Sequence, residues 1–429
     1  MVRPRASFVG VFFALVSLAA MSGVAFAADG PSVVAGYKDG PVTLVSGTTP
    51  AQVASLHLTA GRWLVWAKLY VVNTTTHSGA NVICTLKGPG STATSHRMDV
   101  TAAGDQDGVV HNQPNALATG AVVPSGGGNV ILRCSANGAG SQVKAQHIKI
   151  MAMRVARQTT VNLANGNTSS VGTGTPAVII GSRPGPISLP GYTDTLIADL
   201  SLPAGNWWLR SILDLTTTDN DGGSCWVTVG STDQDRLNFR RDHGRTQAVV
   251  LDAAVHLVNP AHARVYCSGY ANSGVASSYL NHSVKNIRVT ALKVGTLTML
   301  DNGHAFGTTV PKVRYATSQA TFFSINSSWT PTNPLLDVAA GDWMFMAKAN
   351  ISGVAPLIAC ELRALPDYDR SAMGGNGDIT MPFELVHHFA ASGSTRVYCQ
   401  ALSATPTPVA GTIHIAGFRL GSVTNVALP

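Results

Sequence analysis

Residues 60–69 read AGRWLVWAKL, and the pattern returns at residues 204–213 as AGNWWLRSIL and at residues 340–349 as AGDWMFMAKA. The glycines of these segments lie 144 and 136 residues apart. A small Ala-Gly pair is typical of a turn, and the alternating apolar residues that follow it are typical of a β-strand. The chain of 429 residues is therefore predicted to contain three copies of one β unit.

The composition favours β structure and excludes two other classes of protein. Hydrophobic residues make up 45% of the chain and charged residues only 12%, so long disordered regions are not expected. There are 43 glycines and 22 prolines, and glutamate occurs only at Glu361 and Glu384, which argues against a helical protein.

Each copy also contains two cysteines at similar distances from its glycine. The first cysteine follows the glycine by 23, 20 and 19 residues, and the second follows the first by 50, 42 and 39 residues. Neither a C-x-x-C pair nor a Cys/His cluster at zinc spacing occurs, so structural disulfides within each copy are favoured over metal ligation or redox chemistry. The predicted pairs are Cys84–Cys134, Cys225–Cys267 and Cys360–Cys399.

These landmarks define the predicted domains and fold class. A closing apolar segment ends each copy, and we place the repeats at residues 28–155, 156–300 and 301–429. Each repeat has room for about eight strands, which is the size of a jelly roll or an immunoglobulin-like domain. We predict an all-β chain of three tandem two-sheet sandwiches, jelly-roll-like, in which a disulfide bridges the core of each repeat. The sequence leaves open whether the repeats are independent or fused into one block.

The repeated landmarks resemble those of secreted actinobacterial proteins of unassigned function. In those proteins the A-G-x-W stretch often begins L-P-A-G, as residues 202–205 do here. The resemblance covers all three repeats, implies export and β architecture, and brings no catalytic residues. The first repeat departs most, because Arg133 precedes its second cysteine where Tyr266 and Tyr398 precede theirs.

The start of the chain has the pattern of a secretory signal peptide at residues 1–27. Arg3 and Arg5 precede an apolar run over residues 8–20, and Ala25-Phe26-Ala27 is a small-x-small cleavage site. A retained N-terminal anchor helix is the alternative. We expect a secreted, extracellular protein with no membrane span after cleavage.

The charge of the chain does not indicate a nucleic-acid partner. The net charge is +7, or +5 once both signal arginines are removed. The densest basic stretch, at residues 236–245, is interleaved with aspartates, and we interpret it as a solvated loop.

No catalytic motif of a common hydrolase family occurs, and no catalytic residue or cofactor is predicted. Two Asp-x-Asp pairs at equivalent positions are candidate calcium ligands, because clustered oxygens suit a hard cation. They are Asp233 with Asp235 and Asp367 with Asp369. Since the remaining ligands are missing, an aspartate-capped turn is the favoured interpretation.

Aromatic residues are the candidate ligand-binding residues, because apolar ring faces stack on sugars. They are Trp208, Trp226, Tyr266 and Tyr398. Three of them adjoin a cysteine and should point away from the disulfide side of their strands. The alternative is that a neighbouring repeat or subunit covers this face, because large apolar patches usually become interfaces.

The leading hypothesis is a non-catalytic extracellular protein with a structural or adhesive role. The repeated residues are Gly, Trp, Cys and aliphatics, which build a scaffold. The expected partners are a cell-surface glycan or protein, or other copies of the chain. Two alternatives stay open, namely a secreted hydrolase with its site in the second repeat and a carbohydrate-binding lectin.

Overall fold

The computed structural model describes residues 30–429 except 48, 75–78, 101–110, 138–141, 166–176, 218–220, 241–245, 272–281, 319–320, 326, 353–356, 375–377 and 402–406. The predicted signal peptide lies outside these residues. The described chain forms six β-sheets and one short 3-10 helix, η2 (Leu163–Asn165). In this part of the chain no helix has the length and hydropathy that a membrane crossing requires.

The first repeat folds into a two-sheet sandwich. Its strands are β1 (Ser32–Lys38), β2 (Val42–Thr43), β3 (Val45–Ser46), β4 (Ala51–Leu58), β5 (Gly61–Asn73), β6 (Ala80–Lys87), β7 (Thr94–Val100), β8 (His111–Val123), β9 (Gly128–Asn137) and β10 (Val143–Val155). One sheet has the order β1-β10-β5-β8, with β2 beside β10, and the other has the order β3-β9-β6-β7, with β4 beside β9.

The second repeat repeats this arrangement. Its strands are β11 (Arg157–Asn162), β12 (Ala177–Arg183), β13 (Ile187–Leu189), β14 (Thr195–Leu202), β15 (Gly205–Thr216), β16 (Asp221–Val229), β17 (Thr232–Arg240), β18 (Thr246–Leu257), β19 (Ala261–Ala271) and β20 (His282–Val294). The sheet orders are β11-β12-β20-β15-β18, with β13 beside β20, and β14-β19-β16-β17.

The third repeat has the same two sheets. Its strands are β21 (Thr296–Met299), β22 (His304–Phe306), β23 (Lys312–Thr317), β24 (Thr321–Ile325), β25 (Thr330–Val338), β26 (Gly341–Ser352), β27 (Leu357–Ala364), β28 (Asp367–Gly374), β29 (Ile379–Phe389), β30 (Gly393–Ala401) and β31 (Thr407–Arg419). The sheet orders are β22-β21-β23-β31-β26-β29, with β24 beside β31, and β25-β30-β27-β28. A last strand, β32 (Ser422–Ala427), follows.

Eight strands recur in every repeat in a single order. Counted along each repeat, strands 1, 8, 3 and 6 form one sheet, and strands 2, 7, 4 and 5 form the other. We call the first the inner sheet and the second the outer sheet. The inner sheets are β1-β10-β5-β8, β12-β20-β15-β18 and β23-β31-β26-β29, and the outer sheets are β4-β9-β6-β7, β14-β19-β16-β17 and β25-β30-β27-β28. This is the strand order of a jelly roll, as the sequence predicted.

The A-G-x-W motif starts the third strand of each sandwich. Gly205 has a φ of +136° and Gly341 a φ of +122°, which L side chains rarely adopt. Two residues later the tryptophan enters the sandwich core, and its indole N–H donates to the carbonyl four residues earlier in the chain. These hydrogen bonds are 3.0, 2.9 and 2.9 Å long for Trp63, Trp207 and Trp343. The repeated motif therefore fixes how the chain enters its most buried strand.

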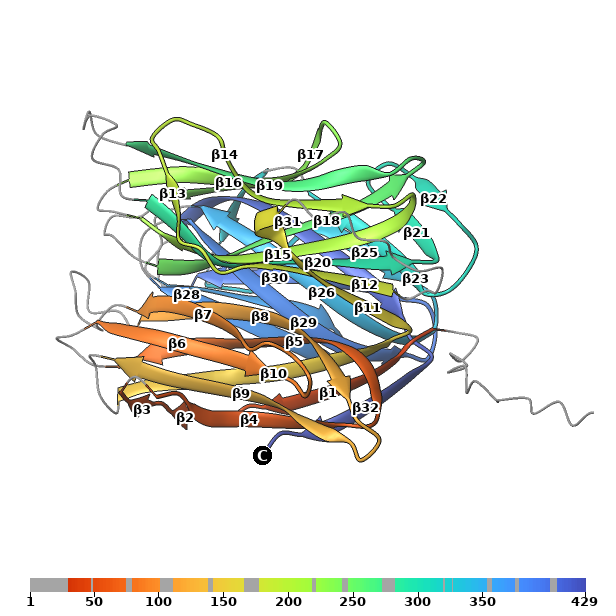
Figure 1. Ribbon diagram of the computed structural model, residues 1–429, viewed down its shortest axis with the longest axis horizontal. Helices are drawn as coiled ribbons and strands as arrows, with labels where there is room; N and C mark the ends of the chain where they lie inside the picture. The colour runs from red at the N-terminus through yellow and green to blue at the C-terminus, as the bar shows by residue number, and fades with distance from the viewer. Residues whose placement is uncertain are drawn as a thin grey trace, which may run out of the picture.

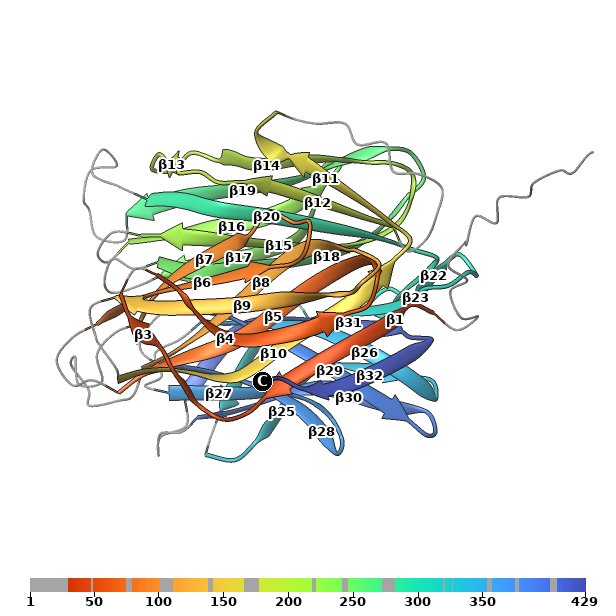
Figure 2. The same cartoon turned by 60° about the horizontal axis from the view of Figure 1, so that its bottom comes forward.

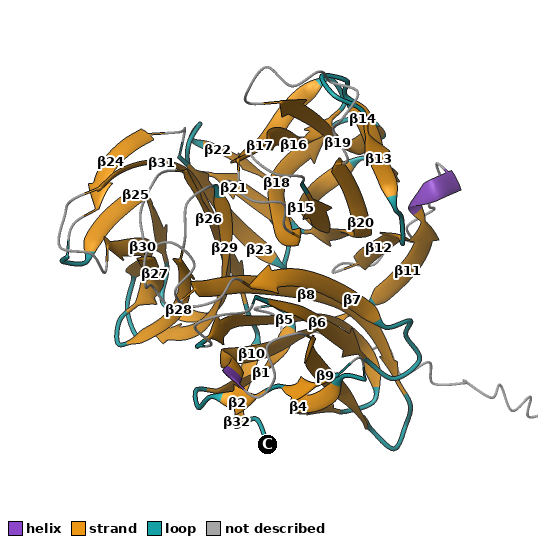
Figure 3. Ribbon diagram, turned by 90° about the vertical axis from the view of Figure 1, so that its left-hand side faces the viewer, coloured by secondary structure: helices purple, strands orange, loops and turns teal. Residues whose placement is uncertain are grey.

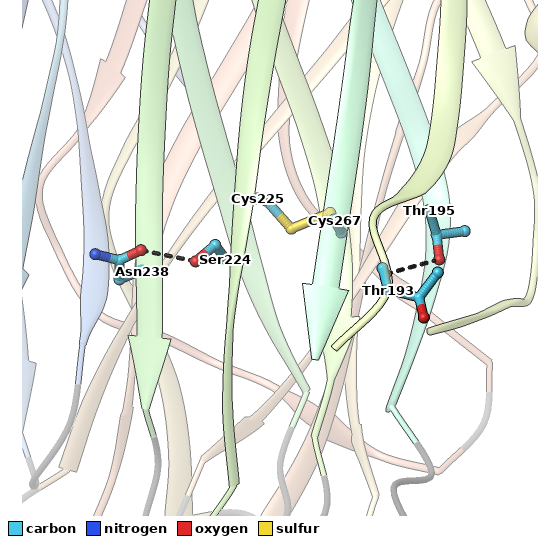
Figure 4. The surroundings of a disulfide bond; sticks show 6 residues. All are labelled: Thr193, Thr195, Ser224, Cys225, Asn238 and Cys267. Atoms are coloured by element: carbon cyan, nitrogen blue, oxygen red, sulfur yellow. Dashed lines mark hydrogen bonds between the residues drawn. A yellow bond between two sulfur atoms is a disulfide. The ribbon is translucent and has the colours of Figure 1, made fainter. Parts of the chain in front are cut away.

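All three predicted disulfides are present, but their position in the sandwich differs from the prediction. Each bond joins the fourth and seventh strands, which are neighbours in the outer sheet (Figure 4). The paired cysteines face each other in register, with Cα atoms 4.1 to 4.2 Å apart. The prediction of a bridge across the core between the two sheets was wrong, because alternation shows only which face a cysteine occupies. The disulfides clamp each outer sheet internally.

The three sandwiches surround a common centre, as Figure 3 shows, and Figure 1 shows them coloured red to yellow, green and blue. Their inner sheets share a fourth apolar core, in addition to the core inside each sandwich. Trp66 meets Trp208 edge-on at 6.0 Å between ring centroids, and Trp208 meets Phe418 at 5.0 Å. The repeats therefore form one fused body.

Each repeat is followed by a strand that pairs with the first strand of the next inner sheet, and the strand after repeat three pairs with repeat one. After the eighth strand, β11 pairs in parallel with β12, β21 with β23, and β32 with β1. The last pairing brings the end of the chain back to the first sandwich and closes the ring (Figure 2). The expected boundary at residues 300 and 301 thus falls inside a sheet of the third sandwich, and residues 422–427 complete the first.

Leu428 anchors the returning strand and provides a test of ring closure. Its side chain is only 6% exposed and packs in the first sandwich core, against the backbone at Gly36. We expect Leu428→Ala to lower the free energy of unfolding by about 2–3 kcal/mol, because it leaves a cavity. Guanidinium denaturation of the oxidised protein measures this. Thr424→Ala, at an exposed position of β32, is the control and should change stability by less than about 0.5 kcal/mol. Equal effects would contradict anchoring by Leu428.

Candidate functional site

The inner sheets meet at three equivalent junctions. At each junction the third and eighth strands of one repeat also approach the fifth strand, at the edge of the outer sheet, of the repeat before it, and repeat one approaches repeat three in this way. We call them the first junction (repeat one with repeat three), the second junction (repeat three with repeat two) and the third junction (repeat two with repeat one). The cross-strand register places Lys68, Lys348 and Ile212 at one equivalent position of the third strand.

A buried ion-pair cluster occupies the first junction. Lys68 and Lys149 of repeat one hold the Asp369 carboxylate of repeat three, with Nζ–Oδ1 distances of 2.9 and 3.1 Å. The backbone N–H of Glu384 donates to the other carboxylate oxygen at 2.7 Å. Burial opposes ionisation of Asp369, but the charges of Lys149 and Lys68 outweigh it and lower the pKa of Asp369.

The second junction repeats this cluster with one substitution. Lys348 and His414 of repeat three contact the buried Asp235 carboxylate of repeat two. The backbone N–H of Asp252 donates to Asp235 at 2.7 Å, as Glu384 does to Asp369. Burial opposes ionisation of Asp235, but His414 and Lys348 outweigh it and hold its pKa below the usual range.

The third junction lacks the lysine–aspartate pair at this position, although the buried side chains of His96 and Asp214 meet at 2.7 Å two residues further along the same strands. Thr94 stands where Asp235 and Asp369 stand, and Ile212 replaces the lysine. Arg288 occupies the position of Lys149 and donates to the Thr94 hydroxyl. Burial lowers the pKa of Arg288 to about 10. The same backbone arrangement therefore accepts either an ion pair or an apolar residue facing a hydroxyl.

The candidate calcium ligands are used differently from the expectation. Asp235 and Asp369 are buried in the junction clusters. Asp233 instead pairs with Arg236 at 2.8 Å on the surface, and Asp367 pairs with His387 at 2.7 Å. Asp233 and Asp367 lie at the starts of β17 and β28, not within a turn. Among the described residues, no group of three or more His, Cys, Asp or Glu side chains could hold a metal ion.

The candidate aromatic residues fall into two groups. Trp208 is fully buried in the central core, so it is not accessible to a ligand and the alternative of coverage by neighbouring repeats applies to it. Trp226, which is only 6% exposed, and the half-buried Tyr266 stack at 5.7 Å on the outer sheet of repeat two, where the Arg236 guanidinium lies 4.3 Å from the Trp226 ring centroid. On repeat three, Tyr398 stacks against an arginine in the same way.

A cavity of about 350 Å³ opens at the first junction, between the inner sheets of repeats one and three. It is bounded by β1, β10, β28, β29 and β32. Tyr37 and Tyr368 stand on its rim with 39% and 48% of their surfaces exposed. Its volume lies within the range of small-ligand pockets.

Glu384 lines this cavity and has no hydrogen-bond partner on either carboxylate oxygen. It is 1% exposed. Burial raises the pKa of Glu384 to about 8, against an opposing effect of the Arg210 charge. Sequence reasoning did not identify this residue as a site. The signal was there, because Glu384 is one of two glutamates and lies within the otherwise uncharged stretch MPFELV at residues 381–386.

No protein-family model and no curated protein matches the chain. Among solved structures, it is similar to a chain of the triple jelly-roll turret assembly of an archaeal virus, with 10% identity, a TM-score of 0.21 and coverage of 92% of each chain. It is also similar to a chain of the infectious bursal disease virus VP2 subviral particle, with 8% identity, a TM-score of 0.23 and coverage of 90% of this chain and 84% of that one. At these TM-scores the likenesses do not bear on function.

The difference between the junctions can be tested by exchange. Lys348→Ile leaves the buried Asp235 carboxylate short of a cation, and we expect the free energy of unfolding to fall by about 3–5 kcal/mol. Adding Asp235→Thr recreates the Ile212 and Thr94 pair of the third junction and should recover most of this loss. Lys312→Met, at an exposed lysine of the same repeat, is the control. A double variant no more stable than Lys348→Ile would contradict the equivalence of the junctions.

The raised pKa of Glu384 predicts a pH dependence of stability. The pKa of Glu384 is about 8 in the folded protein, whereas that of an ordinary, solvent-exposed glutamate is 4.5. The folded form therefore holds the proton more tightly than the unfolded form does. Stability from this group is therefore fully present below pH 4.5, and it decreases as the pH rises to about 8. Glu384→Gln should match the wild type at pH 4.5 and exceed it by a few kcal/mol at pH 9, at about 1.4 kcal/mol per pKa unit. Denaturation across this range, with parallel curves for both proteins, would refute the assignment.

Proposed function

We propose that this protein is a non-catalytic extracellular structural protein that attaches to a cell-surface glycan or protein through its outer sheets. One observation carries the proposal. The residues that recur in all three repeats build the scaffold, and the recurring charges serve the junctions between repeats. The repetition has copied a scaffold, and the central face of each inner sheet is buried against the other two repeats.

Export is part of this proposal. It rests on the predicted signal peptide of residues 1–27 and on the resemblance to secreted actinobacterial proteins. Three disulfides support it, because such bonds persist in oxidising compartments.

The outer sheets of repeats two and three offer the surface for attachment. On repeat two, Arg236 lies against the Trp226 and Tyr266 stack. On repeat three, the Arg363 guanidinium lies 4.7 Å from the Trp329 ring centroid and 4.6 Å from that of Tyr398. Stacked aromatic and guanidinium groups are common in binding surfaces, because they combine apolar area with hydrogen-bond donors.

The alternative of a hydrolase in repeat two receives less support. Its candidate carboxylates, Asp233 and Asp235, are occupied by Arg236 and by Lys348 with His414. A general acid or base must reach the substrate, which the buried Asp235 cannot do, and the exposed Asp233 is then left without the second carboxylate of the pair.

The test uses the full-length oxidised protein from culture supernatant. N-terminal sequencing should find Ala28, and the protein should be retained on cell-wall, chitin or cellulose preparations. Tyr266→Ala with Tyr398→Ala should reduce retention about tenfold or more, with near-UV circular dichroism as the check of folding. Val258→Ser, at an exposed position of repeat two, is the control. A monomer that is retained on none of these surfaces would contradict the proposal.

A further inference from the structure

The three junctions also differ at a second set of side chains, in a layer beside the ion-pair positions. There, the first strand of one repeat faces the sixth strand of the repeat before it, and repeat one faces repeat three. The register places Ala35, Ile180 and Tyr315 at the same position of the first strand. These side chains differ greatly in volume, although the backbone around them is equivalent.

At the second junction this layer is filled and its charge is neutralised. The Tyr315 hydroxyl donates to the backbone carbonyl of Asp252 at 3.2 Å and lies 2.6 Å from Nδ1 of His414. The Asp252 carboxylate is held by Arg210 through two hydrogen bonds of 2.8 and 2.7 Å. Tyr315 therefore occupies the position between the two strands, and the Asp252 carboxylate is neutralised.

At the third junction the layer is apolar. Ile180 and Ala118 are both 1% exposed or less and belong to the central core. The Ile180 side chain packs onto Gly120, and a Cβ atom there would lie 2.6 Å from Ile180 Cδ1. This junction is closed by direct packing.

The first junction alone combines a small residue with an unsatisfied acid. Ala35 leaves the space that Tyr315 fills at the second junction, and the result is the cavity of about 350 Å³. Glu384 stands where Asp252 stands, but Met346 replaces the arginine that would neutralise it. The cavity therefore has a buried acceptor with no partner.

We infer that this cavity is a binding site for a neutral saccharide, whose hydroxyl groups bridge Glu384 and Lys149. The Lys149 ammonium donates to the Asp369 carboxylate and to the Glu384 backbone carbonyl, and its third N–H is left for a ligand. A hydroxyl group both donates and accepts, so neighbouring hydroxyls of one ring satisfy the carboxyl and the ammonium together.

The charges around the cavity favour a neutral ligand over an ion. Asp39 and Asp367 line it and disfavour an anion, and Lys149 lines it and disfavours a cation. The rings of Tyr37 and Tyr368 on the rim supply the apolar surface on which a pyranose face packs. Asn425 and Val426 of β32 also line the cavity, so the site exists only when the returning strand is in place.

The test is calorimetric titration of the full-length oxidised protein with cellobiose, maltose and N,N′-diacetylchitobiose. Tetrahydropyran, which lacks hydroxyls, and sodium acetate serve as ligand controls. We expect at least one disaccharide to bind below about 1 mM and neither control to bind. If no disaccharide binds at about 10 mM, the saccharide assignment is overturned, and binding of acetate alone would assign the cavity to an anion.

Variants locate the binding in the cavity. Ala35→Tyr copies the residue of the third repeat and should weaken binding at least about tenfold by filling the space. Glu384→Gln and Tyr368→Ala should each weaken it about five- to tenfold, which keeps the test decisive if Ala35→Tyr does not fold. Leu365→Ala, at an exposed residue outside the lining, should leave binding unchanged.

Unchanged affinity in the folded cavity variants would place any saccharide elsewhere and would overturn the site. This proposal is independent of the proposed attachment through the outer sheets. Ala35→Tyr should leave retention on cell-wall preparations intact, whereas Tyr266→Ala with Tyr398→Ala should leave disaccharide binding in the cavity intact.

Discussion

Each inner sheet of this protein is apolar on both faces, and this constraint determines the architecture. One face closes a jelly-roll sandwich, and the other is left to be covered. Along β5, Trp63 and Val65 enter the sandwich core while Leu64 and Trp66 enter the central core. Three such sheets facing one another bury all three exposed faces at once, so the sandwiches are stable as a group. The interface between repeats is a core in its own right.

Charged groups inside this core are confined to the junctions, where each has a defined partner. At one equivalent position, two junctions use a lysine and an aspartate and the third uses an isoleucine and a threonine, while His96 and Asp214 meet further along the strands of the third junction. Pairing in a low-dielectric interior contributes little net stability but makes wrong partners costly. The different chemistry of the three junctions therefore distinguishes repeats of almost identical shape. Glu384 departs from this rule, because it keeps a carboxyl without a neutralising partner beside a cavity.

Much of this fold could be predicted from the sequence, because the recurring motifs reveal the repeat unit. The recurring A-G-x-W motif and the paired cysteines gave the number of units, the jelly-roll class and the disulfide partners. The position of the disulfides within one sheet could not be deduced, since alternation is the same for neighbouring strands and for facing sheets. The junctions could not be deduced either, because Lys68 and Asp369 are 301 residues apart and no local pattern links them. Glu384 was the exception, since an acid in an apolar strand is a visible anomaly.

Because β32 pairs with β1, the first sandwich can be completed only after the rest of the chain has been synthesised. Ser32 and Ser422 are neighbours in the sheet, yet they are 390 positions apart in the chain. The ribosome adds residues in sequence, so the edge strand of the first sandwich stays unpaired while the other two sandwiches are made. Its edge is completed by the segment that emerges after them. Assembly in the cell is therefore a process of the whole polypeptide, and a nascent chain that stalls before β32 exposes an unpaired strand to whatever surrounds it.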